Sequence, residues 1–134
     1  RYCPVQKKGR MIEIPLGVLL KNFTLAVVLS TSHPPKVCTL LELNSFGYPL
    51  VRLSYRREGI QIAIAQRGQG VTLNLPKDTR ALILIKEERG LKVYGGKNLL
   101  AVVDLNFPSL YLSEIRVYPS CGRVETVAFY GRPL

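Results

Sequence analysis

One stretch of the sequence, Ala81 to Val103, limits what the chain can fold into more than any other. It reads ALILIKEERGLKVYGGKNLLAVV: a dense apolar run, a charged turn, an alternating run, a glycine pair and a second apolar run. Adjacent glycines permit the positive φ angles that a tight hairpin turn requires. The stretch therefore predicts short antiparallel strands, which need a larger sheet and a second layer to cover their apolar side chains.

The rest of the chain repeats this pattern of short strands. An apolar period of about 3.6 residues, which would indicate a helix, nowhere persists for three turns. In GIQIAIAQ, by contrast, the isoleucines fall on one face of a strand. About eleven such strands, with turns roughly every 8–12 residues, indicate an all-β fold. Two runs, 25–29 and 81–86, are apolar on both faces and predict central, covered strands of a two-sheet antiparallel jelly-roll sandwich.

Length and composition predict a single folded domain spanning residues 1–134. The hydrophobic fraction of 47% is enough for one core, and the charged fraction of 21% is ordinary. No apolar run approaches the roughly 18 residues of a membrane-spanning helix, and residues 1–10 lack the apolar core of a signal peptide. Because a secreted protein loses its signal peptide, this absence does not decide the compartment.

The three cysteines, Cys3, Cys38 and Cys121, include no C-x-x-C pair, so a zinc site is not predicted. Cys3 and Cys121 lie near the chain ends beside the turn formers Pro4 and Gly122, whereas Cys38 lies in the apolar run VCTLLEL. We therefore expect a Cys3–Cys121 disulfide, worth about 4–5 kcal/mol on the chain-entropy model. Cys38 would be a small buried side chain. The alternative is three free thiols in a reducing compartment.

Four segments carry a likeness to a known family. They are NFTLAVVLSTS, TLLELNSFGYPLVRLSYRREGIQIAIAQ, VTLNLPKDTRALILIKEERGLKVYGGKNL and CGRVETVAFYGRPL. In this order they resemble a laminin G-like domain, of the concanavalin-type jelly-roll group that includes the thrombospondin N-terminal modules, over residues 10–134. The best-matching positions are Cys121, Val124, Val127, Gly131, Pro133 and Leu134. The chain departs from the family in lacking tryptophan, in having Gly95 where Asp usually precedes Gly96, and in its short length.

The resemblance implies an extracellular recognition module without enzymatic activity. The residues also predict no enzymatic activity, because the one histidine, His33, precedes two prolines in a loop and no glycine-rich phosphate-binding motif occurs. Laminin G-like domains often bind calcium, but Asp78 and Asp104 are far apart in sequence. We therefore expect no metal and no cofactor. Asn22-Phe23-Thr24 is a sequon for N-glycosylation, which has meaning only in a secreted chain.

Basic residues are the most informative functional feature. Lys and Arg total 19 against nine Asp and Glu, a net charge of +10, which favours polyanionic partners. Arginine side chains suit sulfate oxygens. We predict that a basic sheet face binds sulfated glycosaminoglycan (heparin or heparan sulfate) or an acidic extracellular protein. Its residues are Arg52, Arg56, Arg57, Lys92, Lys97, Arg116 and Arg123, with a second cluster of Lys7, Lys8 and Arg10.

Other interpretations stay open. The basic residues are also consistent with a solvated outer face that carries no partner. A protein-interaction domain of a larger adhesion or receptor ectodomain would use apolar surface instead. A carbohydrate lectin would use Tyr48, Asn44 and Asn74. Nucleic acid is disfavoured, because aromatic residues do not interleave with the basic face and no nucleic-acid motif occurs. The sequence does not decide the oligomeric state.

Overall fold

The computed structural model describes residues 2–4, 11–30, 37–66 and 69–134, and these form mostly β-strands. The helix that they contain, η1 (Pro119–Cys121), is one short 3₁₀ turn, so no helix in the described part of the chain is long and apolar enough to cross a membrane. The strands are β1 (Tyr2–Pro4), β2 (Ile12–Leu20), β3 (Phe23–Leu29), β4 (Cys38–Ser45), β5 (Tyr48–Arg56), β6 (Gly59–Gln66), β7 (Gln69–Leu75), β8 (Ala81–Glu87), β9 (Gly90–Gly95), β10 (Asn98–Asp104), β11 (Leu110–Val117) and β12 (Val124–Tyr130).

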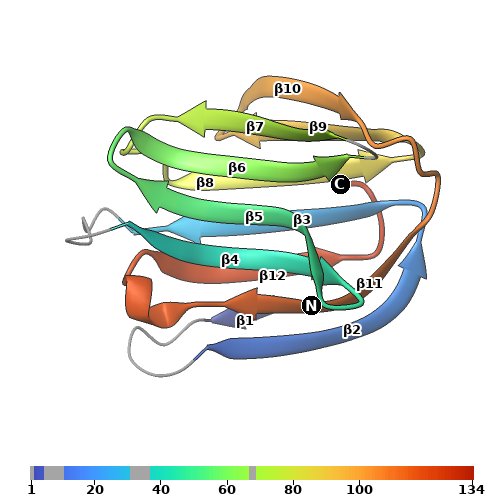
Figure 1. The fold of residues 1–134 in the computed structure, drawn as a ribbon, viewed down its shortest axis with the longest axis horizontal. Helices are drawn as coiled ribbons and strands as arrows, with labels where there is room; N and C mark the ends of the chain where they lie inside the picture. Colours follow the sequence, from blue (N-terminus) through green and yellow to red (C-terminus); the bar gives the residue numbers. More distant parts are fainter. Residues whose placement is uncertain (1, 5–10, 31–36, 67–68) are drawn as a thin grey trace.

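The strands form two antiparallel sheets of six strands each, which face one another as a sandwich (Figure 1). Sheet A has the order β1-β12-β3-β8-β9-β10, and sheet B has the order β2-β11-β4-β5-β6-β7. Successive hairpins build β4 to β7 and β8 to β10, whereas the chain changes sheet after β1, β2, β3, β7, β10 and β11. The predicted all-β jelly-roll sandwich is confirmed.

Apolar side chains at every second strand position fill the space between the sheets. Leu25 and Leu84 of sheet A and Leu43, Leu53 and Ile62 of sheet B are fully buried there. This spacing follows from the two-residue period of a strand, which turns alternate side chains to opposite faces. The other face of each strand is therefore left for solvent or for ligands.

The two strands that are apolar on both faces, β3 and β8, are central strands of sheet A, as predicted, and they lie side by side. Sheet B covers only their inner faces. On the outer face, Ile83 and Ile85 are half-buried and Val28 is 37% exposed. The expectation of cover on both faces is therefore wrong for the residues that the structure describes.

The disulfide joins Cys38 to Cys121, so the predicted Cys3–Cys121 bridge and the predicted free Cys38 are both wrong. Cys38 begins β4, and Cys121 ends the η1 turn that follows the neighbouring strand β11, which brings their Cα atoms to 5.9 Å. Cys3 lies on β1, where its backbone is paired with Val127 of β12. Strand order, and not closeness to the chain ends, decides which cysteines meet.

Two cationic side chains, Lys86 and Arg123, are fully buried near opposite ends of β3. The Lys86 ammonium group donates hydrogen bonds to the backbone carbonyls of Lys21 (2.6 Å), Pro108 (2.8 Å) and Glu88. Burial lowers the pKa of Lys86, and the charge of Glu88 opposes that shift. The three carbonyls belong to the β2–β3, β10–β11 and β8–β9 connections, so one side chain ties three connections together.

Arg123 has the same role at the other end, and its predicted place in a surface site is wrong. Its Nη1 donates to the carbonyl of Lys77 at 2.9 Å, and its Nη2 donates to that of Thr79 at 3.2 Å. Its guanidinium carbon lies 5.4 Å from the centre of the Tyr55 ring. Arginine is rarely buried unless it is paired, which is why sequence alone favours a surface position. Here two carbonyls and an aromatic ring compensate its burial.

The disulfide assignment makes a chemical prediction. The unfolded, non-reduced protein should contain one free thiol, on Cys3, and its digest should contain peptides joined through Cys38 and Cys121. Replacing Cys38 and Cys121 together by serine should lower the free energy of unfolding by about 3–5 kcal/mol, because the bridge closes a long loop. Mass spectrometry and denaturant unfolding measure these outcomes. Peptides that join Cys3 to Cys121, or three free thiols, would contradict the assignment.

The buried lysine makes a prediction about stability. Lys86→Met should lower the free energy of unfolding by about 2–4 kcal/mol, because it leaves buried carbonyls without a donor. Lys92→Met on the neighbouring strand β9, where the side chain is half-buried, is the matched control and should change stability by about 0.5 kcal/mol or less. Urea unfolding measures the free energy of unfolding of both variants, and equal losses would rule out the proposed role of Lys86.

Candidate functional site

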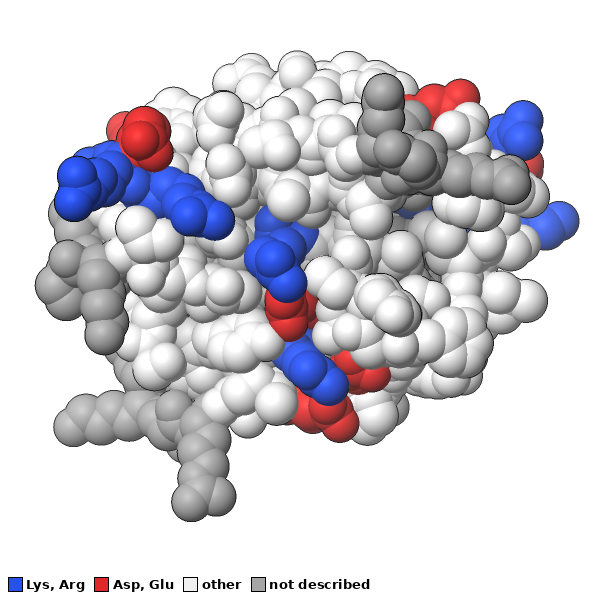
Figure 2. Space-filling model, in the orientation of Figure 1, with Lys and Arg blue, Asp and Glu red and all other residues white. Residues whose placement is uncertain are grey.

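A row of side chains crosses all six strands of sheet B on the face turned away from the core. The strand register pairs Glu13 with Arg116, Arg116 with Glu42, Glu42 with Arg52, Arg52 with Ala63, and Ala63 with Thr72. Residues paired across neighbouring strands point to the same side of a sheet. Figure 2 shows basic and acidic groups alternating down the middle of this face, and a further group of basic side chains at its upper left.

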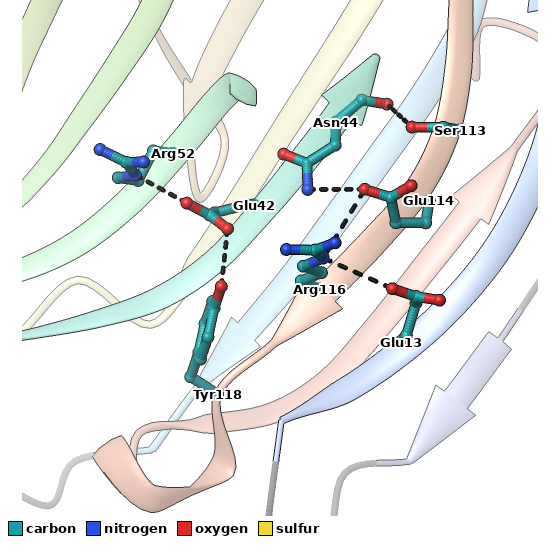
Figure 3. Close-up of polar contacts among 8 residues, drawn as sticks. All are labelled: Glu13, Glu42, Asn44, Arg52, Ser113, Glu114, Arg116 and Tyr118. Atoms are coloured by element: carbon teal, nitrogen blue, oxygen red, sulfur yellow. Dashed lines mark hydrogen bonds and ion pairs between the residues drawn. The ribbon is translucent and has the colours of Figure 1, made fainter. Parts of the chain in front are cut away.

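Glu42 is the centre of a polar network in this row (Figure 3). Its Oε2 accepts a hydrogen bond from Arg52 Nε at 2.8 Å, and its Oε1 accepts one from the Tyr118 hydroxyl at 2.6 Å. Glu42 is buried, whereas the Arg52 side chain is 45% exposed. A buried carboxylate with both oxygens engaged therefore orients a guanidinium group that faces solvent.

Glu114 is a second centre, on β11. Asn44 Nδ2 donates to its Oε2 at 2.7 Å, and Arg116 Nε lies 3.7 Å from Glu114 Oε2 and 3.4 Å from Glu13 Oε1. The Ser113 hydroxyl donates to the backbone carbonyl of Asn44 at 3.1 Å. The Ser113 hydroxyl lowers the pKa of Glu114 most, and the Asn44 amide and Arg116 lower it further, against the effect of burial. Glu114 is therefore ionised at neutral pH.

The network has no surplus of positive charge. Glu13, Glu42 and Glu114 supply three carboxylates against two guanidinium groups, a formal net charge of −1. Burial first, and the hydrogen bond to Glu42 second, raise the pKa of Tyr118 above its ordinary value of 10.0, so its phenol stays a donor. The face thus presents both donors and acceptors, which suits a neutral hydroxyl-bearing ligand better than a polyanion.

A hollow adjoins Arg52 on the outer face of β5, β6 and β7. The small residues Ala63, Ala65 and Gly70 line it together with Arg52 and Thr72. Small side chains leave room for a ligand close to the sheet, while Arg52 supplies a charged donor and Thr72 a hydroxyl group. We call this place the sheet-B hollow.

Exposed aromatic rings lie at the β4–β5 turn, beside the polar network. Phe46 and Tyr48 are 73% and 77% exposed, and the Phe46 ring stacks on Tyr111 with 4.4 Å between centroids. Phe46 has a φ of 49° and Gly47 a φ of 82°. A positive φ is costly for a residue with a bulky side chain and is often kept where it serves a function. The turn therefore displays an aromatic surface at the cost of local strain.

The structure separates the basic residues that the sequence groups into one site. Arg52, Arg56 and Arg116 lie on the outer face of sheet B, Arg57 is exposed at the β5–β6 turn, Lys92 and Lys97 lie on β9 and the β9–β10 turn of sheet A, and Arg123 is in the core. The second predicted cluster, Lys7, Lys8 and Arg10, lies outside the described residues, as does His33. The candidate residues thus do not form one basic face.

The three residues predicted for a lectin site differ in their exposure to solvent. Tyr48 is exposed beside the network, and Asn74 is exposed on β7 with Gln61 as its register partner. Asn44 is almost fully buried, so its expected place at an open rim is wrong. Its Oδ1 is buried without a hydrogen-bond partner among the described residues, while its Nδ2 holds Glu114. Asn44 therefore positions the network and does not face a ligand.

The sequon residues have structural contacts of their own. The half-buried Asn22 precedes β3, and its Oδ1 accepts a hydrogen bond from the Glu88 amide at 3.1 Å. Thr24 is fully buried, and its hydroxyl donates to the carbonyl of Arg132 at 2.8 Å. Thr24 is thus explained by packing, and glycosylation of Asn22 stays a prediction.

The two aspartates considered for calcium do not come together. Asp78 follows β7, and Asp104 ends β10, where its Oδ1 accepts a hydrogen bond from the Asn106 amide at 2.8 Å. In residues 2–4, 11–30, 37–66 and 69–134, no group of three or more His, Cys, Asp and Glu side chains could hold a metal ion.

The sequence does not single out Glu42, Glu114 and Tyr118, although a signal for Glu42 exists. In VCTLLEL, Glu42 stands between Leu41 and Leu43, which marks it as an outward carboxylate on an otherwise apolar strand. Its partners come from β5 and β11. The pairing of β11 with β4 joins segments about 70 residues apart, and local pattern carries no information about it.

Neither a protein-family model nor a curated protein sequence matches the chain. Solved structures match its fold. A Caenorhabditis elegans galectin has a TM-score of 0.70 at 12% identity, over 96% of this chain and 95% of the galectin. The binding domain of botulinum neurotoxin serotype G has a TM-score of 0.62 at 9% identity, over 92% and 40% of the two chains. Trypanosoma rangeli sialidase has a TM-score of 0.59 at 19% identity, over 84% and 21%.

At these identities the likeness concerns the fold alone. The chain spans 40% of the neurotoxin domain and 21% of the sialidase. The galectin and the neurotoxin domain support the predicted concanavalin-type jelly-roll group, without singling out the laminin G-like domain within it.

The network predicts unequal coupling energies around Glu42. A double-mutant cycle of Glu42→Ala with Tyr118→Phe should give a coupling energy of about 1–3 kcal/mol, because the Tyr118 hydroxyl donates its hydrogen bond to a buried carboxylate. The cycle of Glu42→Ala with Arg52→Ala should give a coupling energy of less than about 1 kcal/mol, because the Arg52 side chain is 45% exposed. Denaturant unfolding of the single and double variants measures both terms. A stronger coupling to Arg52 would mean that Arg52 is a structural residue and is not free to bind a ligand.

Proposed function

We propose that the protein is a non-enzymatic module that binds a saccharide on the outer face of sheet B. The observation that carries the proposal is the Arg52 guanidinium group, oriented by Glu42 at 2.8 Å, at the edge of the sheet-B hollow. A sugar ring presents hydroxyl groups that both donate and accept hydrogen bonds, and it needs room beside its polar partners. Arg52, Thr72 and the small side chains of Ala63 and Ala65 offer this combination.

The surroundings of the hollow support the same ligand class. Gln61 and Asn74 are register partners on β6 and β7, next to the row that contains Ala63 and Thr72. Their amide groups add donors and acceptors on the same face. The exposed rings of Phe46 and Tyr48 add apolar surface at the β4–β5 turn, which suits the C–H face of a sugar.

The comparisons support a glycan-binding module in a general way. The galectin is by name a lectin, and its fold covers nearly all of this chain. The neurotoxin segment is a binding domain, and the sialidase has been solved with sialic acid. These properties belong to those proteins. For this chain they favour a saccharide as the ligand without identifying the sugar.

We retain a second candidate, in keeping with the laminin G-like resemblance: sulfated glycosaminoglycan or an acidic protein bound at the β5–β6 turn. Arg56 at the end of β5 and Arg57 in the turn are both exposed, and the net charge of +10 attracts polyanions. Arg52 and Arg116 contribute less to this candidate, because Glu42, Glu13 and Glu114 neutralise them.

Both candidate functions place the protein outside the cell. The Cys38–Cys121 disulfide supports this location, because disulfides persist in oxidising compartments and are rare in the cytosol. An N-linked glycan on Asn22 belongs to the same proposal.

A glycan array that carries neutral oligosaccharides together with heparin and heparan sulfate tests the proposal. We expect the protein to retain a neutral oligosaccharide. Arg52→Ala and Ala63→Leu should each weaken that binding at least about tenfold, since losing an oriented charged donor or filling the hollow costs about 1.4 kcal/mol or more. Arg89→Ala, an exposed arginine of the β8–β9 turn on sheet A, is the matched control and should bind like the unaltered protein.

The same array separates the second candidate from the first. Suppose that the protein binds heparin alone, and that salt weakens this binding and the Arg56→Ala/Arg57→Ala variant loses it. The ligand would then be a polyanion and not a neutral saccharide. If no glycan of either kind were retained, both the neutral saccharide and the sulfated glycosaminoglycan would be wrong as ligands.

A further inference from the structure

We propose that the protein has a second ligand site, beyond the saccharide face, which takes a small apolar group such as an aromatic ring or a short alkyl chain. The site is a cavity of about 190 Å³ between the two sheets. Phe23 and Leu91 of sheet A and Ile64 of sheet B form its inner wall, and all three side chains are fully buried.

The lining determines the chemistry of the ligand. Every residue that lines the cavity has an apolar side chain, so none offers a charged or hydrogen-bonding group. A saccharide, an ion or a charged metabolite would lose its hydration there without compensation. An apolar group loses little hydration energy and gains contact with the walls. The cavity therefore selects against the ligand class proposed for the sheet-B hollow.

The cavity opens to solvent through an apolar mouth. Ala65 on β6 is exposed, and Phe107 in the β10–β11 connection is 38% exposed, while Leu50 on β5 is half-buried. Protein interiors are close-packed and hold few voids larger than a water molecule. The walls of an apolar cavity lack packing contacts that a ligand can supply, and through an open mouth a ligand can reach them without unfolding the sandwich.

The size of the cavity sets an upper limit on the ligand. Engineered apolar cavities of about 150 Å³ in another protein stay dry and bind benzene. A cavity of about 190 Å³ therefore admits one substituted benzene ring or a short alkyl chain. It is too small for a complete lipid or a steroid.

The cavity and the sheet-B hollow meet but can be separated by substitution. Ile64 and Ala65 line both of them, whereas Ala63, two residues earlier on β6, lines the hollow alone. A larger side chain at Ala65 narrows the mouth of the cavity. The same change at Ala63 fills only the hollow. The two alanines thus form a matched pair for testing the cavity independently of the saccharide proposal.

The experiment is a titration of the protein with fluorobenzene, followed by fluorine NMR. We expect saturable binding of one molecule per chain, and intermolecular NOEs from the ring to methyl groups of Ile64 and Leu91. Ala65→Leu should weaken the binding at least tenfold, and Ala63→Leu should leave it unchanged. 4-Fluorobenzoate, which adds a carboxylate to the same ring, should bind at least tenfold more weakly. Cooperative unfolding and the intact disulfide show that both variants are folded.

Several results would overturn the proposal. The site is wrong if fluorobenzene shows no saturable binding up to its solubility limit, or if its NOEs fall on residues outside the cavity. Equal weakening by Ala65→Leu and Ala63→Leu would place the probe in the hollow. Tighter binding of 4-fluorobenzoate would place it on the basic surface. The NOEs of the unaltered protein decide the question even if Ala65→Leu does not fold, and loss of saccharide binding alone leaves these results intact.

Discussion

The sandwich depends on how the connections between its strands satisfy their backbone carbonyls, because these groups leave water at the two ends of the core. Lys86 and Arg123 supply the donors. Lys86 binds carbonyls of the β2–β3, β8–β9 and β10–β11 connections, and Arg123 binds two in the β7–β8 connection. Carbonyl oxygens carry only partial charge, so these hydrogen bonds do not supply either cation with a full counter-charge. Each cation stabilises the fold by fixing several backbone carbonyls at once.

The position of β11 shows how this constraint reaches the candidate site. Lys86 binds the carbonyl of Pro108 just before β11 begins, and the Cys38–Cys121 disulfide fastens the turn just after it ends. The strand is thereby held between β2 and β4, with the Tyr118 amide bonded to the carbonyl of Leu40 at 3.0 Å. In this register the outward groups of β11 meet Glu42 and Asn44. The network on the outer face is thus a consequence of contacts made at both ends of one strand.

The local part of this structure follows from the sequence, and the non-local part does not. Alternation locates the strands and hairpins, because the two-residue period is a property of each segment by itself. It also marks Glu42 as outward. It cannot reveal that Lys86, in an apolar run, points into a ring of carbonyls, since those carbonyls lie 2, 22 and 65 residues away. The disulfide, the burial of Arg123 and the partners of Glu42 likewise depend on strand order, which closes long loops that local pattern does not encode.

The net charge of the chain is a poor guide to its binding face for the same reason. Lys86 and Arg123 are buried, and Arg52 and Arg116 face carboxylates, so four of the 19 basic residues do not add free positive charge to the surface. A polyanion gains affinity by releasing counterions, and each neutralised arginine removes part of that gain. A neutral saccharide releases none, so its affinity depends on the hydrogen bonds that Arg52 and its neighbours make. On this face, orientation of a few groups therefore matters more than the sum of charges.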